Sequence, residues 1–578
     1  MFRESAHIAC VGALAFAFAL ELYAEAKGVG GGAGGSGKTT PTTTTTTTTG
    51  SSSSTSTTTN DGRDDTRRGD AGVDIDAADV PLVDHAASGS SGKDDEDLEG
   101  GVKRRYGEAS SGASSPWSAA ALMESPAFKC LTLRRDALRE SRTTIQAWAE
   151  LSVIMFLFWF CDRSGLVRES KKSYDRDLLI AIFVALAAYG WKTTLRESRT
   201  SSPLHREQTE EMKGWMQVLF LLYHYFDAGE MYNLIRVFIA AYVWMTGFGN
   251  FSYYYVKKDF SAVRFAQMMW RLNFFVLVTC LVMKNDYMLY YICPMHTLFT
   301  LFVYGALAVF KDRNSDAKWI YGKFIACFAI SAVIWEVPGV FNVIFKPFSW
   351  LLGYVNPAKP NVPAMHEWEF RSGLDRYVWI YGMMCAYAHP KYEAFMKWID
   401  DRPTNRERVM YQGGVVATAC AILYWWFVTF FTMDKFDYNK WHPYTSWIPV
   451  TGFILLRNAT KTLRMNHIDV FCICGKVTLE TYISQFHIWL STSGTPNGQP
   501  KMLMSLVPGY PLLNFMLCTY IYIGISHRIF DVTNILKSAC IPSKDNAALV
   551  SNAVVGSIII AASLGLGVFS SLMFTGET

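Results

Sequence analysis

Apolar stretches of membrane-spanning length follow one another along the chain after about residue 143, and short polar segments connect them. A helix needs roughly 20 predominantly apolar residues to cross the hydrocarbon of a bilayer. The stretches around 214, 373 and 443 are shorter, so they could be re-entrant or interfacial. The pattern predicts thirteen candidate spans, at residues 145–162, 178–192, 214–227, 232–255, 270–284, 287–311, 320–345, 373–388, 412–432, 443–456, 470–490, 504–526 and 549–574.

This pattern predicts an all-α fold, a polytopic transmembrane helical bundle of about 10–13 spans. Composition agrees, because 50% of the residues are hydrophobic and the mean hydropathy is +0.12 even with a polar N-terminal tail. The net charge of +4 gives no indication of a nucleic-acid partner. The loops 163–177 and 192–213 carry equal numbers of Lys and Arg, so the positive-inside rule does not fix the orientation.

The first 143 residues differ in composition from the rest. Residues 1–24 contain an apolar run after Arg3 and have the features of a signal peptide or signal anchor. Residues 25–143 are rich in Gly, Ser and Thr and then in acidic residues. Such a segment cannot bury enough apolar area to offset chain entropy, so we expect a disordered tail, which could act as a spacer or carry dense O-glycans. Residues 144–578 form the predicted membrane domain.

Five polar residues recur at every third position of the otherwise apolar stretch 221–255: His224, Asp227, Glu230, Asn233 and Arg236. On one continuous helix they would form a stripe about 18 Å long, at about 1.5 Å of rise per residue. Ionisable side chains at bilayer depth cost at least a few kcal/mol each unless they are paired or face water. We therefore interpret the stripe as a functional site, with hydrogen bonding between packed helices as the structural alternative.

Three further segments carry polar groups in or beside apolar runs. Arg271 and Asn273 begin one span, and His296 lies two residues beyond an expected kink at Pro294. A charged, interfacial-looking segment leads into another span and contains His366, Glu367, Arg371, Asp375 and Arg376. Snorkelling to the membrane surface or plain solvation would also explain these side chains.

A fourth segment, GKVTLETYISQFHIWL, combines an acid with a histidine. Seven residues separate Glu480 from His487, which is almost two helical turns, so the sequence predicts both on one face. Gln485 lies on the adjacent strip. Crowding of these groups on one helix favours function over packing.

Histidine paired with a carboxylate suits two kinds of chemistry. Such a histidine can take a proton from a hydroxyl or hold an acyl group, as acyl transfer to an alcohol requires, while Arg and Lys can bind the phosphates of a coenzyme A donor. A proton-coupled transporter would use the same residue types, so composition leaves both open. The twelve cysteines show no CxxC pair and no His/Cys metal spacing, so we expect neither a disulfide framework nor a metal site.

Long segments of the chain closely resemble the ten-transmembrane O-acetyltransferase family. That family includes the plant reduced wall acetylation proteins, the fungal capsule polysaccharide acetylation protein and the animal sialate O-acetyltransferase. The likeness covers about residues 210–530 and is carried in order by LLYHYFDAGEMYNLIRVFIAAYVWMTGFGNFSYYYVKKDFSAVRFAQMMWRLNFF, DYMLYYICPMHTLFTLFVY, HEWEFRSGLDRYVWIYGMMCAY and GKVTLETYISQFHIWL.

The resemblance implies an O-acetyltransferase, a multi-pass Golgi membrane enzyme that uses acetyl-CoA for O-acetylation of glycans such as cell-wall polysaccharides in the lumen. It implies as catalytic candidates His224, Glu230, His296, His366, Glu480 and His487. It implies as substrate- or cofactor-binding candidates Asn233, Arg236, Arg271, Asn273, Glu367, Arg371, Asp375, Arg376 and Gln485. We favour His224 or His487 as base or acyl acceptor, oriented by Glu230 and Glu480, with Arg236 and Arg271 stabilising negative charge.

The chain departs from the animal and fungal forms in one respect. Those forms carry a lumenal SGNH-type domain with a Gly-Asp-Ser turn, and residues 25–143 contain no such turn, so we expect that domain to be absent, as in the plant-type members. The final transfer is then open between this chain and a separate lumenal SGNH-type acetyltransferase that receives relayed acetyl groups. Two other classes also stay open: a transporter of acetyl-CoA or another anionic metabolite, and a scaffold for lumenal transferases.

Overall fold

The computed structural model describes residues 2–26, 133, 135–541 and 546–575, and these are mostly helical. Each of the thirteen predicted spans falls mainly on helix, which confirms the all-α bundle. The long helices are α1 (Phe2–Ala26), α6 (Arg142–Arg163), α7 (Arg176–Thr193), α8 (Arg206–Phe226), α9 (Tyr232–Lys257), α10 (Ala262–Met283), α11 (Ile292–Ala308), α12 (Ala317–Glu336), α16 (Val378–Asp400), α17 (Asn405–Trp426), α23 (Pro511–Cys540) and α24 (Asn546–Thr575).

Shorter helices connect and brace the long ones. They are α5 (Arg135–Glu140), α13 (Val340–Phe345), α14 (Ser349–Leu352), α15 (His366–Leu374), α18 (Lys435–Thr445), α19 (Trp447–Arg457), α20 (Lys461–Met465), α21 (Asp469–Lys476) and α22 (Thr478–Ser484), with π-helical turns η5 (Phe427–Phe431) and η6 (Gln485–Trp489). The predicted span 504–526 begins later than expected, because residues 502–504 form a strand and α23 starts at Pro511.

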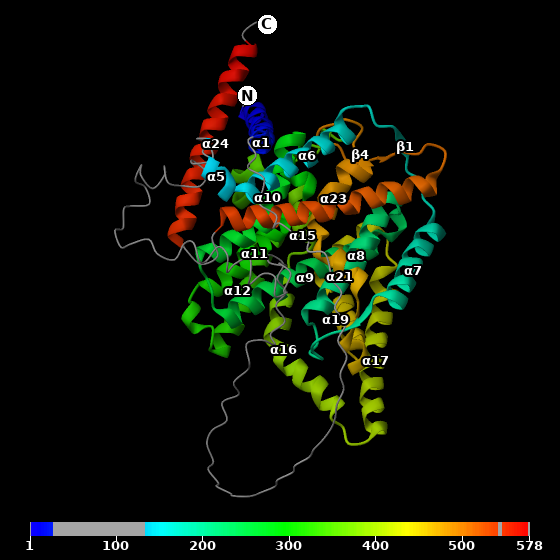
Figure 1. Cartoon of the computed structure of the whole chain (residues 1–578). Coiled ribbons are helices and arrows are strands. Elements are labelled where there is room, and N and C mark those ends of the chain that lie inside the picture. The colour runs from blue at the N-terminus through cyan, green and yellow to red at the C-terminus, as the bar shows by residue number, and fades with distance from the viewer. Residues whose placement is uncertain (1, 27–132, 134, 542–545, 576–578) are drawn as a thin grey trace, which may run out of the picture.

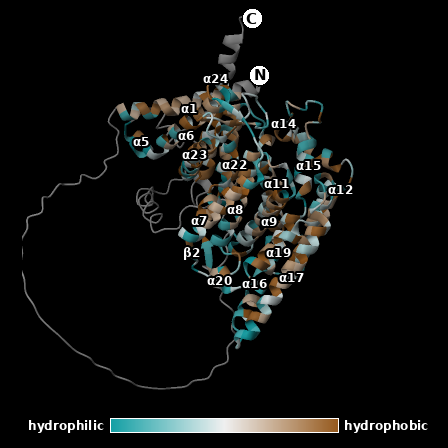
Figure 2. Ribbon diagram, turned by 90° about the vertical axis from the view of Figure 1, so that its right-hand side faces the viewer, coloured by the Kyte–Doolittle hydropathy of each residue, from teal (hydrophilic) through white to brown (hydrophobic). Residues whose placement is uncertain are grey.

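Six of the described helices are long and apolar enough to cross a membrane: Ala6–Ala26, Arg142–Arg163, Gly229–Lys257, Ala262–Met283, Ala317–Glu336 and Asn405–Phe431. The segment containing α9 is the most buried of them, with 78% of its apolar window inside the protein, and α9 lies within the bundle in Figure 1. Apolar residues continue onto the outer helices in Figure 2, where Tyr424 and Trp425 of α17 are 71% and 54% exposed. Such exposed apolar surface is expected where helices face lipid.

The five polar residues of the predicted stripe are divided between two helices and a turn, so the prediction of one continuous helical stripe is wrong. Helix α8 ends at Phe226, Asp227 takes a left-handed conformation with φ of 53°, and a 3-10 turn (Gly229–Met231) leads into α9. Asp tolerates the left-handed region because its short side chain can hydrogen-bond locally, and glycine follows it closely. His224 therefore lies at the end of α8, while Asn233 and Arg236 lie at the start of α9.

Pro294 does not kink a helix, contrary to the sequence-based prediction, because it does not lie in the interior of one. Helix α11 begins at Ile292, which places Pro294 in the first turn. Backbone N–H groups in the first turn of a helix have no acceptor within the helix, so a proline there removes no helical hydrogen bond. His296 consequently lies in a regular helix.

Two small antiparallel sheets lie at the connections. Strand β5 (Met502–Met504) pairs with both β1 (Glu169–Lys171) and β4 (Leu490–Ser491). Strand β2 (Leu195–Glu197) pairs with β3 (Asn466–Ile468), with Arg196 opposite His467. The sheets join the loops that follow α6 and α7 to segments from the C-terminal half of the chain.

The N-terminal helix packs against the rest of the described protein. Arg142 of α6 forms an ion pair with Glu21 at 2.7 Å, and Ser152 Oγ donates to the Leu14 carbonyl at 2.9 Å. Helices α1 and α24 also lie together in Figure 1. The assignment of residues 1–24 as a signal peptide or anchor stays a prediction, and most of the expected disordered tail, 27–132, lies outside the described residues.

Glycines permit the closest approach between helices. A Cβ on Gly475 of α21 would lie 2.0 Å from the Glu210 carbonyl oxygen of α8, and one on Gly214 would lie 1.8 Å from that of Phe471. A Cβ at Gly247 of α9 would likewise meet the Trp379 carbonyl of α16 at 1.9 Å. Contacts this close involve backbone, so neither partner can accommodate a methyl group without a shift of the helices.

Replacing Gly475 with alanine should therefore destabilise the fold, by about 1–3 kcal/mol as for other overpacked positions. Thermal unfolding of the purified protein in detergent would measure the loss. Gly414→Ala is the matched control, because a Cβ there meets nothing within 4 Å and alanine is the better helix former. Equal stability of the two variants would contradict the close packing of α8 on α21.

Candidate functional site

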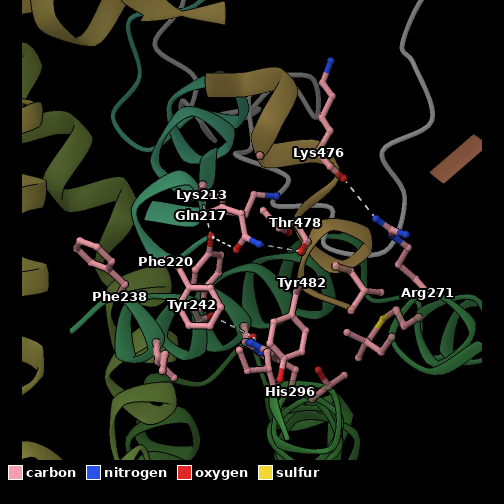
Figure 3. Close-up of a pocket in the computed structure, with 18 of the residues that line it drawn as sticks. Lys213, Gln217, Phe220, Phe238, Tyr242, Arg271, His296, Lys476, Thr478 and Tyr482 are labelled. Atoms are coloured by element: carbon pink, nitrogen blue, oxygen red, sulfur yellow. Dashed lines mark hydrogen bonds between the residues drawn. The ribbon is translucent and has the colours of Figure 1, made fainter. Parts of the chain in front are cut away.

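A cavity of about 110 Å³ lies among helices α8, α9, α10, α11 and the segment α21–α22. Its lining combines apolar side chains with polar groups that include Lys213, Gln217, Tyr242, Thr246, Asn250, Arg271, His296, Thr300, Lys476, Thr478 and Tyr482. Figure 3 shows several of these side chains converging from different helices. A cavity of this size can hold a narrow part of a ligand, such as an acyl chain.

His296 is the histidine on the cavity wall. Its Nδ1 lies 2.7 Å from Thr246 Oγ1, and the same hydroxyl lies 3.2 Å from the Tyr242 carbonyl. When the hydroxyl donates to that carbonyl, it accepts from Nδ1–H, and Nε2 is then the unprotonated nitrogen. Thr246 can thus hold His296 in the tautomer that accepts a proton at Nε2.

Three cationic side chains flank the cavity. Arg271 donates to both carboxylate oxygens of Glu480, one at 3.0 Å, and to the Lys476 carbonyl at 3.3 Å. Lys213 forms an ion pair with Glu210 at 2.8 Å. Lys476 is exposed, and its side chain points away from the cavity in Figure 3. Lys476 is therefore free to contact a ligand at the edge of the site.

Hydrogen bonds make the polar wall rigid. Tyr242 donates to the Lys213 carbonyl at 2.6 Å, and Gln217 Nε2 donates to Thr481 Oγ1 at 3.0 Å. These bonds connect α8 to α9 and to α22. This part of the wall is preorganised because Tyr242 and Gln217 are each held by a neighbouring helix.

Aromatic rings separate the cavity from His224. The Phe220 ring lies 4.6 Å from the His224 ring and 6.0 Å from that of Tyr482, and both Phe220 and Tyr482 line the cavity. His224 itself is not a lining residue. Phe220 thus contacts His224, one turn further along α8, and also lines the cavity that contains His296.

Glu230 does not orient His224, contrary to the sequence-based prediction. Glu230 is exposed and accepts a hydrogen bond from Tyr174, because the turn after Asp227 carries it away from α8. Lys172 contacts the backbone of His224 instead: its ammonium donates to the His224 carbonyl at 2.8 Å. Burial lowers the pKa of Lys172 to about 8, although Asp227 opposes the shift.

His487 lies wholly inside the protein and does not line the cavity. Its Nδ1 lies 2.9 Å from Asp162 Oδ2, and its Nε2 lies 2.5 Å from the Tyr290 hydroxyl. Asp162 also accepts from the Thr492 backbone N–H at 2.7 Å. His487 is 0% exposed and both of its ring nitrogens are engaged, so a substrate could reach it only after a rearrangement.

Glu480 is not the partner of His487, so the second predicted pairing of an acid with a histidine is also wrong. Helix α22 ends at Ser484 and continues as the π-helical turn η6, where a different number of residues per turn changes the direction of the side chains. Glu480 binds Arg271, and His487 binds Asp162. The predicted acid–histidine pair is therefore two separate pairs with different partners.

Arg236 and Asp375 form a buried ion pair at 3.1 Å. His442 Nε2 lies 3.5 Å from the second Asp375 oxygen, and Tyr438 contacts the other nitrogen of His442 at 3.1 Å. All of these groups are at most 1% exposed. Asp375 is thus part of the interior, and the solvated interfacial segment that the sequence suggested does not extend to it.

The other candidates serve packing or lie at the periphery. Asn233 donates to the Phe431 and Met433 carbonyls at 2.9 Å, and Gln485 donates to the Tyr482 carbonyl at 3.0 Å. Asn273 donates to Thr297 at 3.1 Å. His366 is exposed, and ion pairs join Glu367 to Arg371 at 3.2 Å and Arg376 to Glu336 at 2.6 Å.

Sequence reasoning missed several residues of the site. Asp162 is the last residue of the predicted span 145–162, and a carboxylate at the end of an apolar run was its only signal. No sequence signal pointed to Tyr290, Gln217, Tyr242 or Thr246, because tyrosine, glutamine and threonine are common in packed membrane helices. Their role depends on contacts between distant segments.

Comparison with known proteins places the chain. The family model described as "10 TM Acyl Transferase domain found in Cas1p" matches residues 117–554, well over half of the sequence. An N-acetylneuraminate (7)9-O-acetyltransferase of Danio rerio is 32% identical over 461 residues, covering 74% of this chain and 53% of that protein. The chain thus spans about half the length of this relative. No solved structure matches the chain. By its sequence over most of its length, the chain belongs to the ten-transmembrane acyltransferase family.

Proposed function

We propose that the protein transfers acetyl groups from acetyl-CoA to hydroxyls of glycans, as a multi-pass enzyme of the Golgi membrane that delivers them to the lumen. Membership of an acyltransferase family supports the class of reaction. The name of the zebrafish relative supports acetyl as the acyl group and a glycan as the acceptor. The observation that carries the proposal is the cavity in which His296 lies among three cationic side chains.

The residues of the cavity suit binding of a thioester with a phosphorylated tail. Lys476, which is exposed, can bind phosphates at the edge of the site, while the narrow cavity admits the acyl-bearing end of the donor. Arg271, held by Glu480, is a fixed positive charge that can stabilise an oxyanion. His296 Nε2 can accept a proton or an acyl group at the same place.

The arrangement also supports a relay. His224 contacts the ring of Phe220, which lines the cavity together with His296. A movement of the Phe220 ring would open the cavity toward His224. In this proposal an acetyl group passes from the cavity side to the His224 side, where either this chain or a separate lumenal SGNH-type acetyltransferase completes the transfer.

Sealed vesicles that contain the purified protein would test this proposal. Acetyl-CoA labelled on both the acetyl group and the coenzyme is supplied outside, and xylan or sialylated oligosaccharides are trapped inside. We expect acetyl label on a trapped glycan while the coenzyme stays outside. Entry of both labels together without ester formation would instead identify a transporter, and the roles given to His296 and Arg271 would be wrong.

Lys476 offers a separate test of donor binding. Lys476→Ala should raise the KM for acetyl-CoA by up to about tenfold, equivalent to about 1.4 kcal/mol, and leave kcat nearly unchanged, because the ammonium contacts only the tail of the donor. Initial-rate kinetics would measure both constants. Lys461→Ala is the control, since Lys461 is equally exposed but lies off the cavity. Equal KM values for the two variants would place the phosphates elsewhere.

A further inference from the structure

Three potential metal ligands meet outside the cavity, where strand β3 runs into helix α21. They are His467, Asp469 and Cys472, and one ligand atom from each lies within 4.8 Å of the other two. His467 and Cys472 are 6% and 4% exposed, and Asp469 is half-buried. We propose that these three side chains form a binding site for a divalent transition-metal ion such as Zn²⁺.

The imidazole is oriented as a metal ligand requires. His467 Nδ1 lies 2.7 Å from Ser198 Oγ, which leaves Nε2 as the ligating nitrogen. Metal-binding histidines usually engage their other nitrogen with an oxygen of the protein in this way, because the bond fixes both the tautomer and the ring. Ser198 follows strand β2, so the orienting group comes from a distant part of the sequence.

The other two ligands are held by contacts that a metal ion can use or replace. Arg196 contacts Asp469 Oδ2 at 3.2 Å, so the second carboxylate oxygen is available. Arg196 is largely exposed and can keep this contact as an outer partner. The Cys472 thiol donates to the Glu207 carbonyl at 3.3 Å. On binding, the S–H bond breaks, a metal–thiolate bond forms and the proton leaves to solvent.

The mixed set of nitrogen, oxygen and sulfur favours zinc over magnesium or calcium. Thiolate and imidazole are ligands of zinc, whereas magnesium and calcium prefer oxygen atoms alone. Three protein ligands leave a fourth tetrahedral position for water. The spacing His-x-Asp-x-x-Cys is not a familiar zinc pattern, which is why the sequence analysis expected no metal.

A metal here would lock the β2–β3 sheet to the start of α21. That helix carries Gly475 and Lys476, which line the cavity, and it packs closely on α8. The ion would therefore act as a structural clamp beside the site. The inference does not depend on the proposed reaction, because metal content can be measured whether or not the protein transfers acetyl groups.

Elemental analysis of protein purified without chelators would test the site. We expect one equivalent of zinc per chain, and Cys472→Ser and His467→Gln should each retain less than about a tenth of it. Cys474→Ser is the matched control, since Cys474 lies on the same helix outside the cluster and should keep the full amount. Absence of metal from the wild-type protein, or equal metal in all variants, would overturn the proposal.

Cobalt substitution distinguishes the loss of a metal ligand from misfolding of a variant. Co²⁺ added to metal-free wild-type protein in detergent should produce a thiolate-to-cobalt charge-transfer band in the near ultraviolet, and the band should be absent in Cys472→Ser and present in Cys474→Ser. Size-exclusion chromatography would show that each sample is folded before the spectrum is recorded. A band that survives in Cys472→Ser would show that another cysteine binds the metal.

Discussion

Replacement of His296 with alanine is expected to lower the rate of acetyl transfer by at least about 100-fold, the usual minimum for loss of a general base. The effect is large because His296 is the histidine on the wall of the cavity and Thr246 already fixes its tautomer. Transfer of labelled acetyl to a glycan in vesicles would measure the rate. The amount of protein in the membrane should not change, since the substitution removes the hydrogen bond to Thr246 at the wall of a polar cavity and no buried ion pair.

His366→Ala is the control for this experiment. His366 is exposed at the start of α15 and lies off the cavity, although the family resemblance implied a catalytic role for it as well. It should retain near wild-type activity. If His296→Ala stays active while His224→Ala or His487→Ala does not, the chemistry takes place outside this cavity and the preference for His296 is wrong.

Asp162→Ala should destabilise the protein by about 3–5 kcal/mol, the usual cost of removing one member of a buried charged pair. The carboxylate accepts bonds from His487, from the Thr492 backbone and hydroxyl and from Ser491, so its loss leaves several buried donors without an acceptor. Thermal unfolding in detergent would show the loss as a lower Tm.

The matched control for that experiment is Asp312→Ala, because Asp312 is an exposed acid outside the buried network and should leave the Tm unchanged. The same samples separate two roles for the pair. If Asp162→Asn unfolds like wild type yet loses acetyl transfer, the pair positions His487 for chemistry. If both Asp162 variants keep wild-type stability, the buried network contributes little to the fold.

The helical bundle and its segments could be predicted from the sequence because lipid imposes a local rule. Each span must satisfy its backbone hydrogen bonds within itself and present apolar side chains to lipid, so every span leaves a continuous apolar run. Helix ends were less accurate at Pro294, where α11 begins at Ile292 and not at 287, than at Asp227, where the predicted spans already leave a break. A first-turn proline marks the start of α11, and hydropathy does not detect it.

The partners of the polar residues could not be predicted in the same way. Within a helix, residues three or four apart are neighbours, which is why Glu480 was paired with His487 and Glu230 with His224. In the structure these groups bond across helices: Glu480 to Arg271, and His487 to Asp162, more than three hundred positions away in sequence. A buried charge takes whichever partner the packing brings closest.

The sequence by itself determined that this chain is a helical membrane protein, and its motifs determined the acyltransferase family. It also identified His296 and Arg271 among the candidates. Only the tertiary structure decided that these two share a cavity and that His487 is enclosed with Asp162 and Tyr290. The reason is physical: spans are specified by local hydropathy, whereas a site forms where side chains from several helices meet, and that depends on contacts between segments far apart in the sequence.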